Sequence, residues 1–131
     1  MNKLFNYLVI TVIALYAAFI ALPFYWHHLY EGETLIAMQW NGWGSLIEPN
    51  GIIAWSFAML NFIALIGLIY FKKWARTLFL VITISTGLIS PAFGLIVAAG
   101  IDAIVGYYIS ISYGIIVTMS YFTSVSNEFK T

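Results

Sequence analysis

Four long apolar runs constrain this chain more than any other feature. They cover Leu4–Leu22, Ile52–Phe71, Leu78–Ala99 and Ile104–Phe122. Each run is 19 to 22 residues long, and about 20 residues of α-helix, rising 1.5 Å per residue, cross the ~30 Å hydrocarbon core of a bilayer. The runs occupy most of the 131 residues. They predict a single integral membrane domain over residues 1–131, an all-α antiparallel four-helix transmembrane bundle.

The charged side chains are few and lie on separate sides of the predicted membrane. Only 8% of residues are charged, against about 25% in a soluble domain. All basic residues fall on one side: Lys3, Lys72, Lys73, Arg76 and Lys130. Four acidic residues fall on the other: Glu31, Glu33, Glu48 and Asp102. Because Lys and Arg are retained in the cytoplasm, both termini are predicted to be cytoplasmic, in a multi-pass protein of the bacterial inner (plasma) membrane.

The connections between the runs differ in length. Pro23 is predicted to end the first helix, because proline suits a helix boundary better than its interior. The long outer loop, residues 24–51, holds a short interfacial helix at Glu33–Trp40. The links after Phe71 and after Ala99 are short and predict that the helices they join are neighbours. The polar tail after Phe122 is predicted to fray.

The amino-acid composition argues against several classes of function. There are no cysteines, so a dithiol, an iron–sulfur cluster or a thiolate metal site is excluded. Formal net charge is zero, which argues against a nucleic-acid partner. No nucleophile–base pair, phosphate loop or intramembrane carboxylate pair is evident. We therefore expect a protein without enzymatic activity or cofactor, whose first partner is the lipid bilayer.

Small side chains recur every fourth residue in the last two runs. They are Thr86, Ser90, Gly94 and Ala98 in one, and Gly106, Ser110, Gly114 and Thr118 in the other. Residues at this spacing share one helix face, and small side chains let membrane helices approach closely. The pattern predicts that the two faces meet as the seam of a hairpin. The alternative is that one face docks a partner helix or lines a polar path. Pro91 is predicted to kink the third helix.

Two polar residues, Asn61 and Asp102, each have a structural and a functional interpretation. Asn61 lies deep in the second run, where its amide is expected to bond to Ser or Thr of the third helix, or else to a substrate. Asp102 precedes the fourth run, where its carboxylate is expected to cap the helix N-terminus. The alternative is a proton or cation site. If a polar path exists, Asn61 and Asp102 are its candidates.

Four residues near the end of the first run form the one candidate metal cluster: His27, His28, Glu31 and Glu33. If the first helix continues past Pro23, His27 and Glu31 share a face at i,i+4, and imidazole with carboxylate suits zinc. No second pair of ligands is evident, so the sequence predicts no metal site.

A resemblance supports the same fold. Lys72-Lys73-Trp74-Ala75-Arg76, Leu88-Ile89-Ser90-Pro91, Gly94-Leu95, Asp102 and Tyr121-Phe122 resemble a group of small, uncharacterised four-helix inner-membrane proteins of proteobacteria. The resemblance covers roughly the last 60 residues. It implies fold and location, and no activity.

These observations favour helix-to-helix recognition of a membrane partner. One form is an immunity protein that blocks a membrane-inserting toxin, and another is an accessory subunit of a membrane complex. The alternative is a small oligomeric channel or transporter formed by self-association, with Asn61, Asp102 and Thr86 as its polar path. A lipid- or quinone-modifying enzyme that uses His27 and His28 ranks last.

Overall fold

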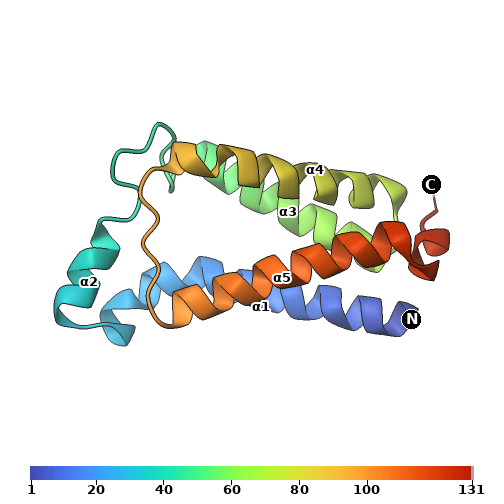
Figure 1. The fold of residues 1–131 in the computed structure, drawn as a ribbon, viewed down its shortest axis with the longest axis horizontal. Helices are drawn as coiled ribbons and strands as arrows, with labels where there is room; N and C mark the ends of the chain where they lie inside the picture. Colours follow the sequence, from blue (N-terminus) through green and yellow to red (C-terminus); the bar gives the residue numbers. More distant parts are fainter. Residues whose placement is uncertain (131) are drawn as a thin grey trace.

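The structure is a computed structural model that describes residues 1–130, and its regular structure is helical (Figure 1). The α-helices are α1 (Asn2–Leu29), α2 (Gly32–Gln39), α3 (Ile52–Ile69), α4 (Lys73–Ile89) and α5 (Ile101–Phe122), with 3₁₀ turns η1 (Ser90–Phe93) and η2 (Ser124–Glu128). Within residues 1–130, four helices are long and apolar enough to cross a membrane: α1, α3, α4 together with η1, and α5. The short helix α2 lies apart from them, at the end of the molecule away from both termini (Figure 1).

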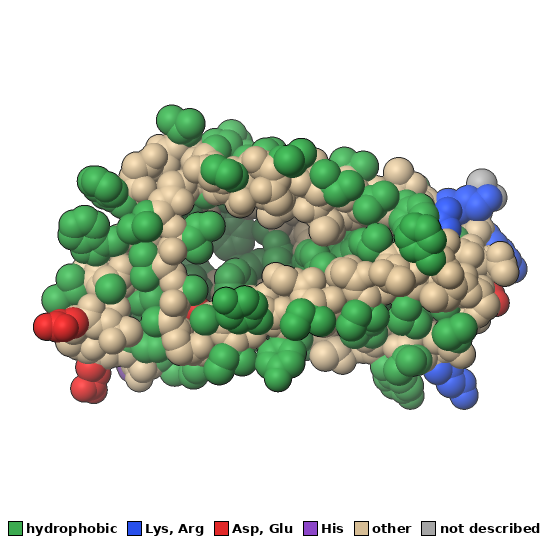
Figure 2. Space-filling model, in the orientation of Figure 1, with side chains coloured by type: hydrophobic (Ala, Val, Ile, Leu, Met, Phe, Trp, Pro, Cys, Tyr) green, Lys and Arg blue, Asp and Glu red, His purple; other side chains and the backbone are tan. Residues whose placement is uncertain are grey.

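The outer surface of the long helices is apolar. Between 11% and 28% of the residues in each apolar window are buried inside the molecule, and large side chains such as Ile52, Leu88 and Tyr107 are exposed on the sides. Figure 2 shows this apolar surface along the length of the molecule, with Lys and Arg at one end and most acidic side chains at the other. We call these the basic end and the acidic end. An apolar surface of this extent is typical of a protein surrounded by lipid.

The long helices pack as two pairs, α1 with α5 and α3 with α4. The consecutive helices α4 and α5 touch far less than the members of either pair. The seam expected between them is therefore absent: Gly114 has no neighbouring atom within 4 Å of an added Cβ, and Ser110 and Thr118 are exposed. Residues 90–100 connect the two helices, which meet instead toward the basic end, where the Phe79 and Tyr113 ring centroids lie 4.9 Å apart and Arg76 Nη1 donates to the Ser120 carbonyl at 3.1 Å.

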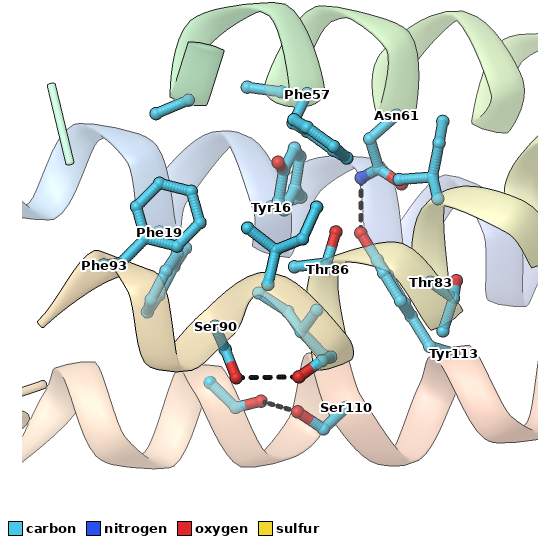
Figure 3. Close-up of a pocket in the computed structure, with 17 residues that line it drawn as sticks. Tyr16, Phe19, Phe57, Asn61, Thr83, Thr86, Ser90, Phe93, Ser110 and Tyr113 are labelled. Atoms are coloured by element: carbon cyan, nitrogen blue, oxygen red, sulfur yellow. Dashed lines mark hydrogen bonds between the residues drawn. The ribbon is translucent and has the colours of Figure 1, made fainter. Parts of the chain in front are cut away.

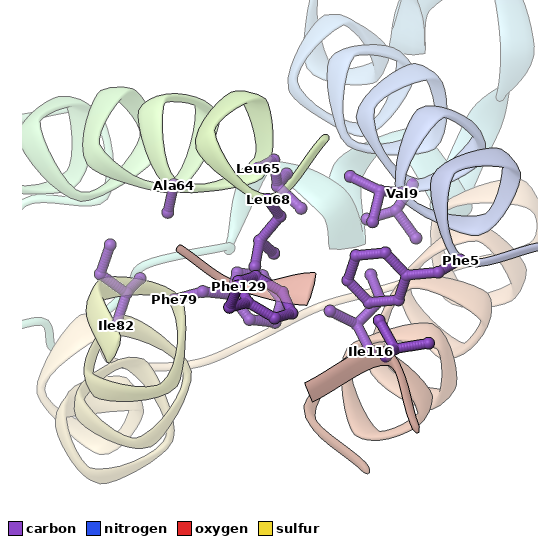
Figure 4. Packing of buried hydrophobic residues seen from close by; sticks show 11 residues of the cluster. Phe5, Val9, Ala64, Leu65, Leu68, Phe79, Ile82, Ile116 and Phe129 are labelled. Atoms are coloured by element: carbon purple, nitrogen blue, oxygen red, sulfur yellow. The ribbon is translucent and has the colours of Figure 1, made fainter. Parts of the chain in front are cut away.

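The hydrophobic core lies toward the basic end. It combines side chains from all four long helices with two from the chain end (Figure 4): Phe5, Val9, Val12, Ala64, Leu65, Leu68, Phe79, Ile82, Ile116, Val125 and Phe129. Phe129 is only 3% exposed, and its ring lies against Phe5 and Phe71. The Lys130 N–H donates to the Phe71 carbonyl at 2.9 Å. The expectation that residues after Phe122 fray is therefore wrong up to Lys130.

The first helix is longer than the sequence predicts. It passes through Pro23 and ends at Leu29, so the boundary expected at Leu22 is wrong. Its 28 residues would span about 42 Å at 1.5 Å per residue, more than a ~30 Å hydrocarbon core. A proline inside a membrane helix is tolerated where neighbouring groups satisfy the freed backbone.

The third predicted helix is shorter than expected. It begins at Lys73 and ends at Ile89, and residues 94–99 are not helical. Pro91 has no N–H and its ring clashes with the preceding turn. Gly94 follows with a φ of +77°, which glycine adopts without strain. The expected kink is thus a helix end, and Gly94 and Ala98 do not share a helix face with Thr86.

The long loop closes the acidic end. Its backbone bonds to the segment after η1: Gly42 N–H donates to the Leu95 carbonyl at 2.7 Å, and Leu95 N–H donates to the Trp43 carbonyl at 2.9 Å. A Cβ added at Gly94 would lie 2.6 Å from the Trp43 carbonyl oxygen. Only glycine permits this close approach.

Candidate functional site

A cavity of about 500 Å³ lies between the four long helices. Its lining comes from all of them and includes Tyr16, Phe19, Phe57, Asn61, Thr83, Thr86, Ser90, Phe93, Ser110 and Tyr113 (Figure 3). Ligand pockets typically measure ~300–1,000 Å³ and are mainly apolar with a few polar groups. The volume and lining of this cavity fit that description.

The cavity exists because α4 and α5 contact each other toward the basic end, where the Phe79 ring lies against the Tyr113 ring, and separate farther along. Thr86 and Gly87 of α4 are exposed, as is Ser110 of α5, and all three belong to the lining. Figure 2 shows the hollow between these two helices on the face toward the viewer. The opening therefore faces sideways, toward the surroundings of the apolar helix surface.

Of the eight small residues that recur at four-residue spacing, only four line the cavity. Thr86, Ser90, Gly106 and Ser110 line the cavity. The other four lie outside its lining: Gly114 and Thr118 are exposed farther along α5, and Gly94 and Ala98 lie in the extended segment before it.

Asn61 is the most deeply buried polar side chain of the cavity, with 2% of its surface exposed. Its Nδ2 donates a hydrogen bond to the Tyr113 hydroxyl, and its Oδ1 is buried without a partner (Figure 3). The expected bond to Ser or Thr of the third helix is therefore wrong, because the partner lies on α5. Asn61 has an acceptor that nothing in the described chain uses.

Sequence reasoning missed Tyr113 as a site residue. Nine tyrosines are spread along the chain, so its residue type alone carries little information. A signal was present, since Tyr113 follows Ser110 by three positions and Gly106 by seven, and residues at this spacing share a face.

Three of the four Ser and Thr hydroxyl groups of the lining donate to a backbone carbonyl three or four positions earlier. Thr83 Oγ1 donates to the Phe79 carbonyl at 2.8 Å, and Ser110 Oγ donates to the Gly106 carbonyl at 2.9 Å. Such bonds occupy the hydroxyl proton and leave oxygen lone pairs free. The lining thus offers hydrogen-bonding oxygen atoms in an otherwise apolar wall.

Asp102 lies outside the cavity lining and does not cap α5. It is 5% exposed and is the second residue of the helix, whose N-cap is Gly100. Trp26 Nε1 donates to its Oδ1 at 3.0 Å, and the Tyr30 hydroxyl lies 2.6 Å from its Oδ2. The carboxylate therefore ties the end of α1 to the start of α5, and the expected N-cap role is wrong.

The Tyr30 hydroxyl takes part in several hydrogen bonds at this contact. It also lies within hydrogen-bond distance of the Ala99 carbonyl and accepts from the Ile101 N–H at 3.1 Å. Burial raises the pKa of the Tyr30 hydroxyl above its usual value, and the hydrogen bond to Asp102 raises that pKa further. Tyr30 therefore remains a neutral donor at physiological pH.

The candidate metal residues are not brought together as a ligand set. Helix α1 ends at Leu29, and Glu31 follows in extended backbone as the N-cap of α2. The face that His27 and Glu31 would share in a continuous helix is therefore not formed. His27 and His28 are exposed with ring centroids 3.9 Å apart. Among residues 1–130, no group of three or more His, Asp or Glu side chains has the arrangement of a metal site.

Comparisons with protein-family models, with curated proteins and with solved structures find no match to this chain. The resemblance to small proteobacterial inner-membrane proteins stays a prediction.

Proposed function

We propose that this protein is a non-enzymatic, multi-pass protein of the bacterial inner membrane that binds a lipid-soluble molecule in its central cavity. In this proposal the four long helices form an antiparallel bundle. The basic end, with both termini, faces the cytoplasm, and the acidic end faces the periplasm. The separation of Lys and Arg from most acidic side chains supports this orientation.

One observation carries the binding function: the cavity opens sideways between α4 and α5, where Thr86, Gly87 and Ser110 are exposed. In a bilayer this opening lies along the membrane-facing flank of the helices. A molecule dissolved in the membrane can then enter without passing through water. Toward the basic end, the hydrophobic core fills the space between the helices.

The lining supports binding more than catalysis. Its described side chains are apolar, aromatic, hydroxyl-bearing or amide, and none is a carboxylate, a histidine or a lysine. General acid–base catalysis uses groups that gain or lose a proton near neutral pH. Hydroxyl and amide groups instead orient a ligand through hydrogen bonds.

A photoactivatable apolar reagent tests this proposal. An iodophenyl diazirine is added to the protein in lipid nanodiscs, and labelled residues are identified by mass spectrometry. We expect labelling of Phe57 and Thr83 inside the cavity, and its loss in Gly87→Leu. The matched control is Gly114→Leu, because an added Cβ meets nothing within 4 Å at either glycine and only Gly87 lines the cavity. Interior labelling that is absent, or equal in the two variants, would overturn the proposal.

A second candidate function is recognition of a partner helix, as an immunity protein or an accessory subunit. It is favoured by one observation: Ser110, Gly114 and Thr118 form an exposed face of small residues on α5, of the kind that lets membrane helices approach closely. A photo-crosslinking amino acid at Thr118, compared with one at the exposed Ile63 of α3, tests this candidate. A specific adduct at Thr118 that Gly114→Leu abolishes would support it, whereas equal adducts at both positions would not.

A further inference from the structure

We infer that the cavity selects an uncharged apolar molecule that carries one hydroxyl group, and that this hydroxyl binds between Asn61 and Tyr113. The inference rests on the proposed binding function and names the chemical class of the ligand. It follows from the hydrogen bonds that these two side chains make and leave unmade.

The first step concerns the acceptor. The Asn61 side chain is 2% exposed, its Oδ1 is buried without a partner, and the residue borders the cavity. Buried amide oxygens are nearly always hydrogen-bonded, because an unpaired acceptor in apolar surroundings is costly. A ligand with an O–H or N–H donor relieves this cost.

The second step concerns the donor. The Tyr113 hydroxyl accepts the hydrogen bond from Asn61 Nδ2, which leaves its own proton available to donate. A hydroxyl is both donor and acceptor. One ligand hydroxyl can therefore donate to Asn61 Oδ1 and accept from Tyr113, which a ketone, an ester or an ether cannot do.

The third step concerns charge and depth. Asn61 lies near the middle of α3, nine positions after its first residue Ile52, and thus at mid-depth in the proposed membrane orientation. An ionised group at the bilayer centre is costly without a partner, and none of the described side chains that line the cavity is charged. This excludes phosphate- or carboxylate-bearing head groups and leaves a neutral hydroxyl on an apolar body.

The aromatic lining is compatible with two classes of ligand that carry such a hydroxyl. Phe19, Phe57 and Phe93 border the cavity (Figure 3) and can pack against an aliphatic chain or an aromatic ring. A long-chain alcohol and an alkylphenol share the required chemistry. They become separate arms of the experiment.

The experiment measures binding of three probes to the full chain in nanodiscs by native mass spectrometry. The probes are 1-hexadecanol, 4-dodecylphenol and hexadecyl methyl ether, which has an acceptor but no donor. We expect at least one hydroxyl probe to bind about tenfold more tightly than the ether, equivalent to about 1.4 kcal/mol. The hydroxyl probe with the higher affinity shows whether the cavity prefers an aliphatic alcohol or a phenol.

Variants test whether Asn61 and Tyr113 cause the preference for hydroxyl probes over the ether. The double variant Asn61→Leu with Tyr113→Phe removes the polar pair without leaving either partner unpaired, and we expect it to bind the hydroxyl probes and the ether equally. The matched control is Ser56→Ala on the same helix, because Ser56 is exposed and lies outside the lining. If the double variant does not fold, NMR of the Asn61 side-chain amide in the unaltered protein supplies the second measurement. That signal should shift with a hydroxyl probe and not with the ether.

The outcomes separate the two proposals. Equal binding of all three probes to the unaltered protein would overturn the hydroxyl inference and leave the binding function standing. A preference for hydroxyl probes that survives in the double variant would overturn the placement at Asn61. Binding of none of the probes, together with failure of the diazirine labelling, would overturn both.

Discussion

The indole Nε1 of Trp26 lies 3.0 Å from Oδ1 of Asp102, although 76 positions separate the two residues in the chain. Together with the Tyr30 hydroxyl, 2.6 Å from Oδ2, it holds the last turn of α1 against the first turn of α5. This contact lies at the acidic end, beyond the cavity and far from the hydrophobic core at the basic end.

Replacing Trp26 by Phe should weaken this contact. The change keeps an aromatic ring and removes the N–H, so the buried Asp102 carboxylate loses one donor. Hydrogen bonds to charged groups contribute about 1.5 to 3 kcal/mol, and we expect a loss of that size in the free energy of unfolding. Circular dichroism in mild detergent measures it. Trp55→Phe is the control, because Trp55 is exposed on α3; equal losses in the two variants would contradict the role of Trp26.

The stabilising effect of Tyr30 should depend on pH. Its pKa in the folded protein is raised above the usual value of 10.0 by burial and by Asp102. The stabilisation from the neutral hydroxyl is therefore fully present below pH 10 and is lost as the pH rises through the folded-state pKa. Unfolding curves from pH 7 to 11.5 should show that the advantage of the unaltered protein over Tyr30→Phe disappears at the alkaline end. Tyr70→Phe, an exposed tyrosine at the basic end, controls for general alkaline effects, and a constant difference for Tyr30 would contradict the prediction.

Two glycines should respond in opposite ways to alanine. A Cβ at Gly67 would lie 2.5 Å from the Cβ of Ala75, in the contact between α3 and α4. Overpacking of this kind typically costs about 1 to 3 kcal/mol. At Gly114 nothing lies within 4 Å, so Gly114→Ala should be neutral or stabilising, because alanine has the higher helix propensity. Thermal unfolding of the two variants side by side checks the contrast, which fails if Gly114→Ala is the less stable protein.

The residues after α5 should contribute strongly to stability. Phe129 is 3% exposed and packs against Phe5 and Phe71, and large-to-small changes of buried Phe cost about 3 to 5 kcal/mol. We expect Phe129→Ala to lower the unfolding temperature and to speed hydrogen exchange of the α1 amides near Phe5. Phe122→Ala is the matched control, since Phe122 is 82% exposed. Unchanged exchange near Phe5 would show that the tail is not part of the core.

The sequence predicted the helical class and the number of apolar helices because both depend on local composition. It predicted the wrong helix boundaries near Pro23 and Pro91. These two prolines have the same chemistry but opposite effects on their helices. Helix α1 continues past Pro23, whereas α4 ends just before Pro91. The difference lies in distant partners: the backbone after Pro91 bonds to the loop around Trp43, and no local pattern shows such a partner.

The cavity could be predicted only in part for a similar reason. Polarity identified Asn61, and spacing identified eight small residues, of which four line the cavity. Their arrangement depends on which helices pair, and the short link that the sequence predicts after Ala99 favours the wrong pairing, whereas residues 90–100 separate α4 from α5 in the structure. The partnership of Asn61 with Tyr113 follows from that pairing and was therefore missed.

The hydrogen bonds between the long loop and the segment after η1 connect the cavity to the acidic end. Leu95 N–H donates to the Trp43 carbonyl, and Phe93, two positions earlier, borders the cavity. Suppose that filling the cavity alters how tightly the loop holds a second molecule. Thermodynamic reciprocity then requires that the second molecule change the affinity of the cavity by the same factor. Occupancy of the cavity and binding at the loop would in that case be linked in both directions.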